Sequence, residues 1–142
     1  MVDETLILRK LTELEEYHKQ ANEFSQITVG EYQKDWKVQR VIERTLQMMI
    51  ETCTDIAGHI ISDKKYRTPH SYAETFEVLY ENGLLLEDLF NAMQKMAKFR
   101  NIVVHHYDKV DAEIVVGILR SNLSDFISFK ETIIKTIKNN NL

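Results

Sequence analysis

The chain has 142 residues, a formal net charge of −4 at pH 7, 44% hydrophobic residues and 28% charged residues. The chain is therefore not one of the strongly basic proteins that bind duplex nucleic acid through many phosphates. Any contact with a nucleic acid has to use a local basic surface. Four glycines and one proline are few for this length and favour long helices over many short strands. We expect one domain over residues 1–142, built around a single hydrophobic core.

Cys53 is the only cysteine, so an internal disulfide is impossible, and its apolar helical surroundings are typical of a buried thiol in a reducing compartment. Residues 1–5 carry acidic side chains where a secretory signal would carry basic ones. No apolar run has the length of a membrane helix. The sequence therefore predicts a cytoplasmic protein without a membrane segment.

Apolar residues at steps of three and four predict amphipathic helices along most of the chain. The first covers about residues 3–27. Thr28 and Glu31 then form a possible capping box, from which one long helix is expected to run to about residue 62. Residues 63–70 interrupt the pattern with the only proline and with Lys64, Lys65 and Arg67, so they predict a loop that is either a solvated surface or a contact for phosphates.

Ser71 and Glu74 have the spacing of a helix cap, and Asn82 with Gly83 predicts the end of a short helix. The apolar stripe resumes at Leu84 and continues to Val104. Asp111 is the expected N-cap of a final helix, about 112–137, with a buried face made of Val115, Leu119, Leu123, Phe126, Ile127, Ile133 and Ile137. Together these patterns predict an all-α, antiparallel up-and-down bundle of four main helices and a short connecting helix.

Several kinds of chemistry are excluded, because the chain has no Walker lysine loop, no glycine-rich dinucleotide turn and no zinc spacing of cysteines and histidines. Glu51, Asp55 and His59 follow one another at four-residue steps, so they share a helix face. A metal site there is conceivable. A polar ridge is the favoured interpretation, because metal ligands usually come from more than one element.

Residues 100–107 hold Arg100, Asn101, His105, His106 and Tyr107, the densest group of side chains able to bind or cleave a phosphate ester. Arg100 and His105 are five residues apart, about 140° around a regular helix, so one helix makes a poor active site from them. Two copies meeting at a twofold axis would bring both pairs to one cleft. The alternative is a helix end at which Arg and His only stabilise the dipole.

Cleavage of RNA without a metal or other cofactor needs a base for the 2′-hydroxyl, an acid for the leaving oxygen and a cation for the charged phosphorane. Histidine suits the first two tasks because its ordinary pKa of about 6.5 leaves both protonation states accessible near neutral pH. Arginine remains charged and presents a planar fork to phosphate oxygens. A dimer containing two copies of Arg100 and His105 would supply all three parts.

The residues Arg100, Asn101, His105 and Tyr107 fit the R-x4-H-x-Y pattern of the HEPN superfamily, specifically of HepT-type toxins. Residues 41–61 also resemble the long second helix of that family, and Ser71, Tyr72 and the apolar positions that follow resemble its short connecting helix; the similarity covers roughly residues 35–130. The resemblance implies a homodimeric helical bundle with Arg100 and His105 as the ribonuclease pair and Asn101 in support.

The resemblance further implies a partner, a minimal nucleotidyltransferase antitoxin that transfers AMP to Tyr107 and silences the nuclease. The chain lacks the transferase's own glycine-serine and paired aspartate motif, so it corresponds to the toxin. Two alternatives remain open. One is a non-catalytic helical module that binds the nucleotidyltransferase or a nucleotide, and the other is a dimer in which residues 100–107 only pack the interface.

Overall fold

The computed structural model describes residues 3–139, and every regular element in that range is helical, which confirms the all-α prediction. The α-helices in order are α1 (Glu4–Asn22), α2 (Val29–Lys34), α3 (Trp36–Lys64), α4 (Tyr72–Glu81), α5 (Glu87–His105), α6 (Ala112–Gly117) and α7 (Ser124–Lys138). Within residues 3–139, no helix combines the length and the apolar character needed to cross a membrane.

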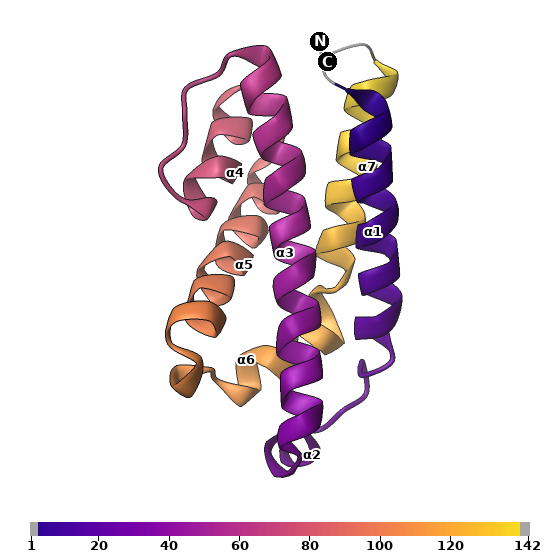
Figure 1. Cartoon of the computed structure of the whole chain (residues 1–142), viewed down its shortest axis with the longest axis vertical. Helices are drawn as coiled ribbons and strands as arrows, with labels where there is room; N and C mark the ends of the chain where they lie inside the picture. The colour runs from indigo at the N-terminus through magenta and orange to yellow at the C-terminus, as the bar shows by residue number, and fades with distance from the viewer. Residues whose placement is uncertain (1–2, 140–142) are drawn as a thin grey trace.

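The four long helices α1, α3, α5 and α7 run alternately down and up the bundle, and α4 lies beside the upper part of α5 (Figure 1). Helix α1 begins and α7 ends at the same end of the molecule, whereas α2 and α6 lie at the other end (Figure 1). Helix α3 is central, because it contacts α1, α2, α4 and α5. The expected up-and-down arrangement of the long helices is therefore present.

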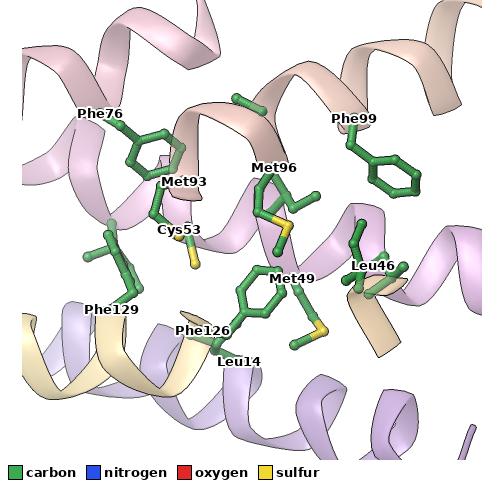
Figure 2. Packing of buried hydrophobic residues seen from close by; sticks show 14 of the residues in the cluster. Leu14, Leu46, Met49, Cys53, Phe76, Met93, Met96, Phe99, Phe126 and Phe129 are labelled. Carbon is green, nitrogen blue, oxygen red and sulfur yellow. The ribbon is translucent and has the colours of Figure 1, made fainter. Parts of the chain in front are cut away.

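The core is a continuous apolar cluster to which all the long helices contribute. Figure 2 shows Met49, Met96 and Phe126, from three different helices, gathered around one part of it. Cys53 lies in the same cluster, fully buried, and this burial raises the pKa of its thiol. The predicted buried thiol is thus confirmed, and a thiol in this environment is a poor nucleophile.

The single helix predicted for residues 28–62 is wrong, because the chain forms two helices there. The capping box is present: Thr28 Oγ1 accepts a hydrogen bond from the amide of Glu31 at 3.1 Å, and Glu31 Oε1 accepts one from the amide of Thr28 at 3.0 Å. However, Asp35 is extended (φ −126°) and its carboxylate accepts from the amides of Lys37 and Val38. Asp35 is therefore a second N-cap, which restarts the helix as α3.

A buried polar contact holds α2 against α3. The hydroxyl of Tyr32 donates to Glu43 Oε2 at 2.7 Å, and both residues are buried. The Gln39 side-chain amide donates to the carbonyls of Tyr32 and Gln33, which lie in the last turns of α2 and would otherwise lack partners. Desolvation and the neighbouring Glu43 carboxylate both raise the pKa of Tyr32, so its hydroxyl stays protonated and keeps donating.

The helical run predicted for 112–137 is present but contains a π-helical turn, Ile118–Asn122, between α6 and α7. A π turn holds more residues than an α turn, so it shifts the side chains that follow around the axis. Phe126 faces the core as predicted, and so does Phe129, but the prediction that Ile127 is buried is wrong, since it is 43% exposed.

The predicted caps around the remaining helices are confirmed. Ser71 Oγ accepts from the amide of Glu74 at the start of α4, Gly83 takes a positive φ of 77° after its end, and the Asp111 carboxylate caps α6. Helix α5 ends at His105, and Tyr107 opens a short 3-10 turn, Tyr107–Lys109. The R-x4-H-x-Y pattern therefore occupies the last turns of α5 and the connection that follows.

Candidate active site

Arg100 is held by three groups from three helices. Its Nε and Nη2 each lie 2.9 Å from Glu51 Oε2 of α3, and its guanidinium carbon lies 4.3 Å from the centre of the Tyr72 ring of α4. Nη1 also donates to Asn101 Oδ1 at 3.2 Å. The side chain is 15% exposed, so these charged and aromatic contacts form in a partly desolvated position, where they are stronger than at an open surface.

Glu51 is the partner of Arg100 that the sequence did not identify. Gln47, one turn earlier on α3, donates its side-chain amide to the same carboxylate oxygen at 3.0 Å. The sequence grouped Glu51 with Asp55 and His59, but Asp55 instead pairs with Lys10 of α1 at 3.5 Å, and His59 is exposed. Residues 3–139 contain no cluster of three or more candidate metal ligands. The polar ridge is thus a set of separate links between helices.

His105 and His106 are both exposed at the end of α5. Neither side chain makes a hydrogen bond or ion pair with the described residues, and nothing joins His105 to Arg100. One copy of the chain therefore presents a fixed arginine and a free histidine on the same helix without bringing them into contact. This agrees with the five-residue spacing, which places the two side chains on different helix faces.

Tyr107 is 64% exposed in the turn after α5. The guanidinium carbon of Arg40, near the start of α3, lies 5.8 Å from the centre of its ring. The phenol therefore lies at the surface, beside a cation from another helix. Sequence reasoning did not find Arg40, because it lies 67 positions before Tyr107 and on a separate helix.

Arg67, one of the three cations predicted to touch RNA, is engaged by the protein itself. Its Nε and Nη2 lie 2.9 and 2.8 Å from the Glu81 carboxylate, and Nη1 contacts Glu74, both on α4. The pKa values of Glu74 and Glu81 are lowered, chiefly by these hydrogen bonds. Arg67 therefore joins the 63–70 loop to α4 and has little free charge for a phosphate.

Lys64 ends α3 and Lys65 is its C-cap, at the far end of the bundle from the turn that follows α5 (Figure 1). Glu51 marks the level of Arg100 along α3, and Lys64 lies thirteen residues further on. At about 1.5 Å per residue this is roughly 20 Å. The two lysines of the predicted basic loop therefore lie away from the arginine, although the loop leads into Tyr72, whose ring contacts Arg100.

A family model for ribonuclease HepT-like proteins matches residues 14–133. The chain belongs to the ribonuclease HepT-like family. The resemblance to HepT-type HEPN proteins is thereby confirmed, and the match spans the bundle from α1 to α7.

Two curated relatives of this HepT-like chain have nuclease names. The mRNA nuclease HepT of Shewanella oneidensis is 33% identical over 104 residues, which cover 73% of this chain and 78% of the relative. The tRNA nuclease HepT of Aphanizomenon flos-aquae is 26% identical over 110 residues, which cover 78% of this chain and 75% of the relative.

A solved structure, that of a tri-AMPylated Shewanella oneidensis HEPN toxin in complex with MNT antitoxin, has a similar fold. Its TM-score is 0.84 at 29% identity, and the match covers 95% of this chain and 99% of that one. The helical arrangement described above is therefore shared along nearly the full length of both chains.

The Arg100–Glu51 pair should contribute measurably to the stability of this HepT-like bundle. We expect Glu51→Ala to lower the free energy of unfolding by about 1–3 kcal/mol, because it leaves a partly buried guanidinium without its counter-charge. Urea unfolding of Glu51→Ala, Arg100→Ala and the double variant measures the coupling. The more exposed Lys10–Asp55 pair serves as the matched control and should give a smaller coupling energy. Equal coupling in the two pairs would contradict this role.

The Arg67 cluster should give a stability that depends on pH. Because Glu74 and Glu81 have pKa values below the ordinary 4.5, they stabilise the fold above that pH, and this contribution disappears as the pH falls through their lowered values. Thermal unfolding should therefore show Arg67→Ala less stable than the wild type near neutral pH and equally stable in acid. Lys64→Ala is the control, and the difference in unfolding temperature between this variant and the wild type should not change with pH.

Proposed function

We propose that the protein is a metal-independent endoribonuclease toxin in which Arg100 and His105 of two protomers share one cleft at the interface of a homodimer. Membership of the ribonuclease HepT-like family carries this proposal, since both named HepT relatives are RNA nucleases. The separation of Arg100 from His105 in one chain supports the dimer, because a twofold axis supplies a second copy of each.

In the proposed reaction a neutral His105 takes the proton of the 2′-hydroxyl, and the 2′-oxygen then attacks the adjacent phosphorus. The bond from phosphorus to the 5′-oxygen breaks, and the protonated His105 of the second protomer donates a proton to that leaving oxygen. Arg100 stabilises the negative charge that develops on the phosphorane. Its guanidinium carries more N–H donors than its contacts with Glu51 and Asn101 use, so it can bind a phosphate oxygen without leaving Glu51.

The surroundings of Arg100 support its proposed role. Glu51 and the Tyr72 ring fix the guanidinium plane, and Asn101 orients its remaining edge. A cation held in advance stabilises a developing charge without a reorganisation cost at the moment of reaction. We therefore assign Asn101 and Glu51 to positioning Arg100, and the chemistry itself to Arg100 and His105.

We further propose that the nuclease is neutralised in the cytoplasm by a nucleotidyltransferase antitoxin that modifies Tyr107. The tri-AMPylated relative in complex with MNT antitoxin supports this, and the Tyr107 phenol is exposed and within reach of another protein. Its oxygen would attack the α-phosphorus of ATP held by the partner, forming a phosphodiester and releasing pyrophosphate. The added phosphate and nucleoside would obstruct RNA beside His105.

Substitution of His105 tests the nuclease. His105→Ala should reduce cleavage of a fluorescent RNA about a hundredfold or more in buffer containing EDTA, as expected for a lost acid and base. His106→Ala is the matched control, because it removes the neighbouring exposed histidine, and it should retain activity. Arg100→Ala should also lose cleavage, but it can weaken the fold, so Arg100→Lys is measured beside it. Cleavage by His105→Ala at the wild-type rate would contradict the assignment, and binding of the nucleotidyltransferase by an inactive wild type would favour a non-catalytic module.

Substitution of Tyr107 tests the neutralisation. With the partner transferase and ATP, intact-mass spectrometry should show AMP units on the wild-type protein and none on Tyr107→Phe, which keeps the ring and removes only the acceptor oxygen. Tyr80→Phe, which alters another partly exposed tyrosine, should be modified like the wild type. AMP addition to Tyr107→Phe would disprove the assigned site.

A further inference from the structure

A hollow of about 520 Å³ lies between the first half of α3 and the turn that follows α5. Its lining combines two arginines, an exposed phenol, an amide, a buried carboxylate and one apolar residue: Arg40, Glu43, Arg44, Gln47, Val103 and Tyr107. We call this hollow the Arg40–Arg44 groove. It opens beside Tyr107, two positions after His105, at the end of α5 where the proposed cleavage takes place.

The two arginines of this groove differ in how they are held. Arg40 Nη1 lies 3.3 Å from Glu43 Oε1. Glu43 is itself buried and accepts a hydrogen bond from Tyr32, so this fixed carboxylate holds Arg40 in place. About half of the Arg40 side chain, 54%, remains exposed. Arg44 is exposed and makes no hydrogen bond or ion pair with residues 3–139. With a single carboxylate beneath two guanidiniums, the groove has an excess of positive charge.

We propose that the Arg40–Arg44 groove binds the RNA strand next to the cleaved bond, with the two guanidiniums on a phosphate and the Tyr107 ring against a base. The substrate class rests on the nuclease function proposed above. Single-stranded RNA sites combine cations that follow the backbone with aromatic rings on which bases stack, and this groove contains both. It also offers a local basic surface in a chain whose net charge is −4, since it places two arginines beside one carboxylate and one of them, Arg44, has no partner among the described residues.

The Arg40–Arg44 groove is a better candidate for binding RNA than the loop at 63–70. Arg67 is occupied by Glu74 and Glu81, and Lys64 and Lys65 lie at the other end of α3. In contrast, Arg40 is 5.8 Å from the Tyr107 ring, and Tyr107 closely follows His105 in the chain. A strand in the groove would therefore lie at the end of α5 that carries the candidate catalytic histidine.

Binding of an RNA that cannot be cleaved tests the groove. A fluorescein-labelled single strand of 2′-O-methyl nucleotides lacks the attacking hydroxyl, and its anisotropy is titrated with the full chain at several salt concentrations. Arg44→Ala and Arg40→Gln should each weaken binding about five- to twentyfold at low salt, and each should reduce the slope of log Kd against log salt by about 0.7 for one lost phosphate contact. Arg44→Lys should keep the wild-type slope because it keeps the charge.

Arg9 provides the control, because it is an exposed arginine near the start of α1, and the start of α1 lies at the opposite end of the bundle from the start of α3, which carries Arg40 (Figure 1). Arg9→Ala should bind RNA like the wild type. Arg44 has no partner in the described chain, so Arg44→Ala should unfold at the wild-type temperature, and weaker binding by this variant then reflects the groove itself.

The outcomes separate this inference from the nuclease proposal. Wild-type affinity and salt slope in both Arg44→Ala and Arg40→Gln would overturn the groove while leaving the His105 test untouched. Loss of binding in these variants would support the groove even if the wild type cleaved no RNA. If both variants kept full RNA binding but prevented the addition of AMP to Tyr107, the groove would serve the modification, and the RNA assignment would be wrong.

Discussion

The ion pair between Arg100 and Glu51 fixes the geometry on which the candidate site depends. Apolar packing holds α3, α4 and α5 together, but it is non-directional and constrains their relative positions only loosely. A guanidinium bound to one carboxylate oxygen and lying against the Tyr72 ring is directional, so it ties the three helices together at one level along the bundle. The places of His105 and Tyr107 follow, because they lie only five and seven residues further along the chain, at the end of α5 and in the turn after it.

A comparison of Arg100 with other arginines explains how a protein with a negative net charge can bind RNA. A cation is available to a ligand only if its own chain leaves donors free. Arg67 contacts three carboxylates and joins a loop to a helix, whereas Arg44 contacts none among the described residues. Arg100 is intermediate, since it is anchored but not saturated. Net charge, which averages over these cases, therefore says little about where RNA can bind.

Periodicity and caps predicted much of the fold, because both are local properties of the sequence. Thr28, Ser71 and Asp111 begin helices as their side chains indicated. Asp35 was missed, since an aspartate on the polar face of a helix has the same local pattern as one that starts a helix. The exposure of Ile127 was missed because Ile127, four residues after Leu123, and Phe129, three residues after Phe126, both fit a helical stripe.

The candidate site was predictable only in part. Arg100, His105 and Tyr107 lie within eight residues of one another, so their density was visible in the chain. Glu51 lies 49 positions before Arg100, and Arg40 lies further still from Tyr107, so both contacts depend on how α3 packs beside α5. A charged residue near an apolar stripe indicates that some partner exists, but the packing of the helices decides which one.

The number of residues in the segment that contains the π turn between α6 and α7 determines which side chains of α7 enter the core. Each residue of an α-helix turns the chain by about 100°, so the length of the segment between Gly117 and Phe126 decides which side of α7 meets the bundle. Side chains in this segment can be exchanged for others of similar size while the register is kept. A change of one residue in its length would instead rotate Phe126 and Phe129 together, away from the neighbours they now contact.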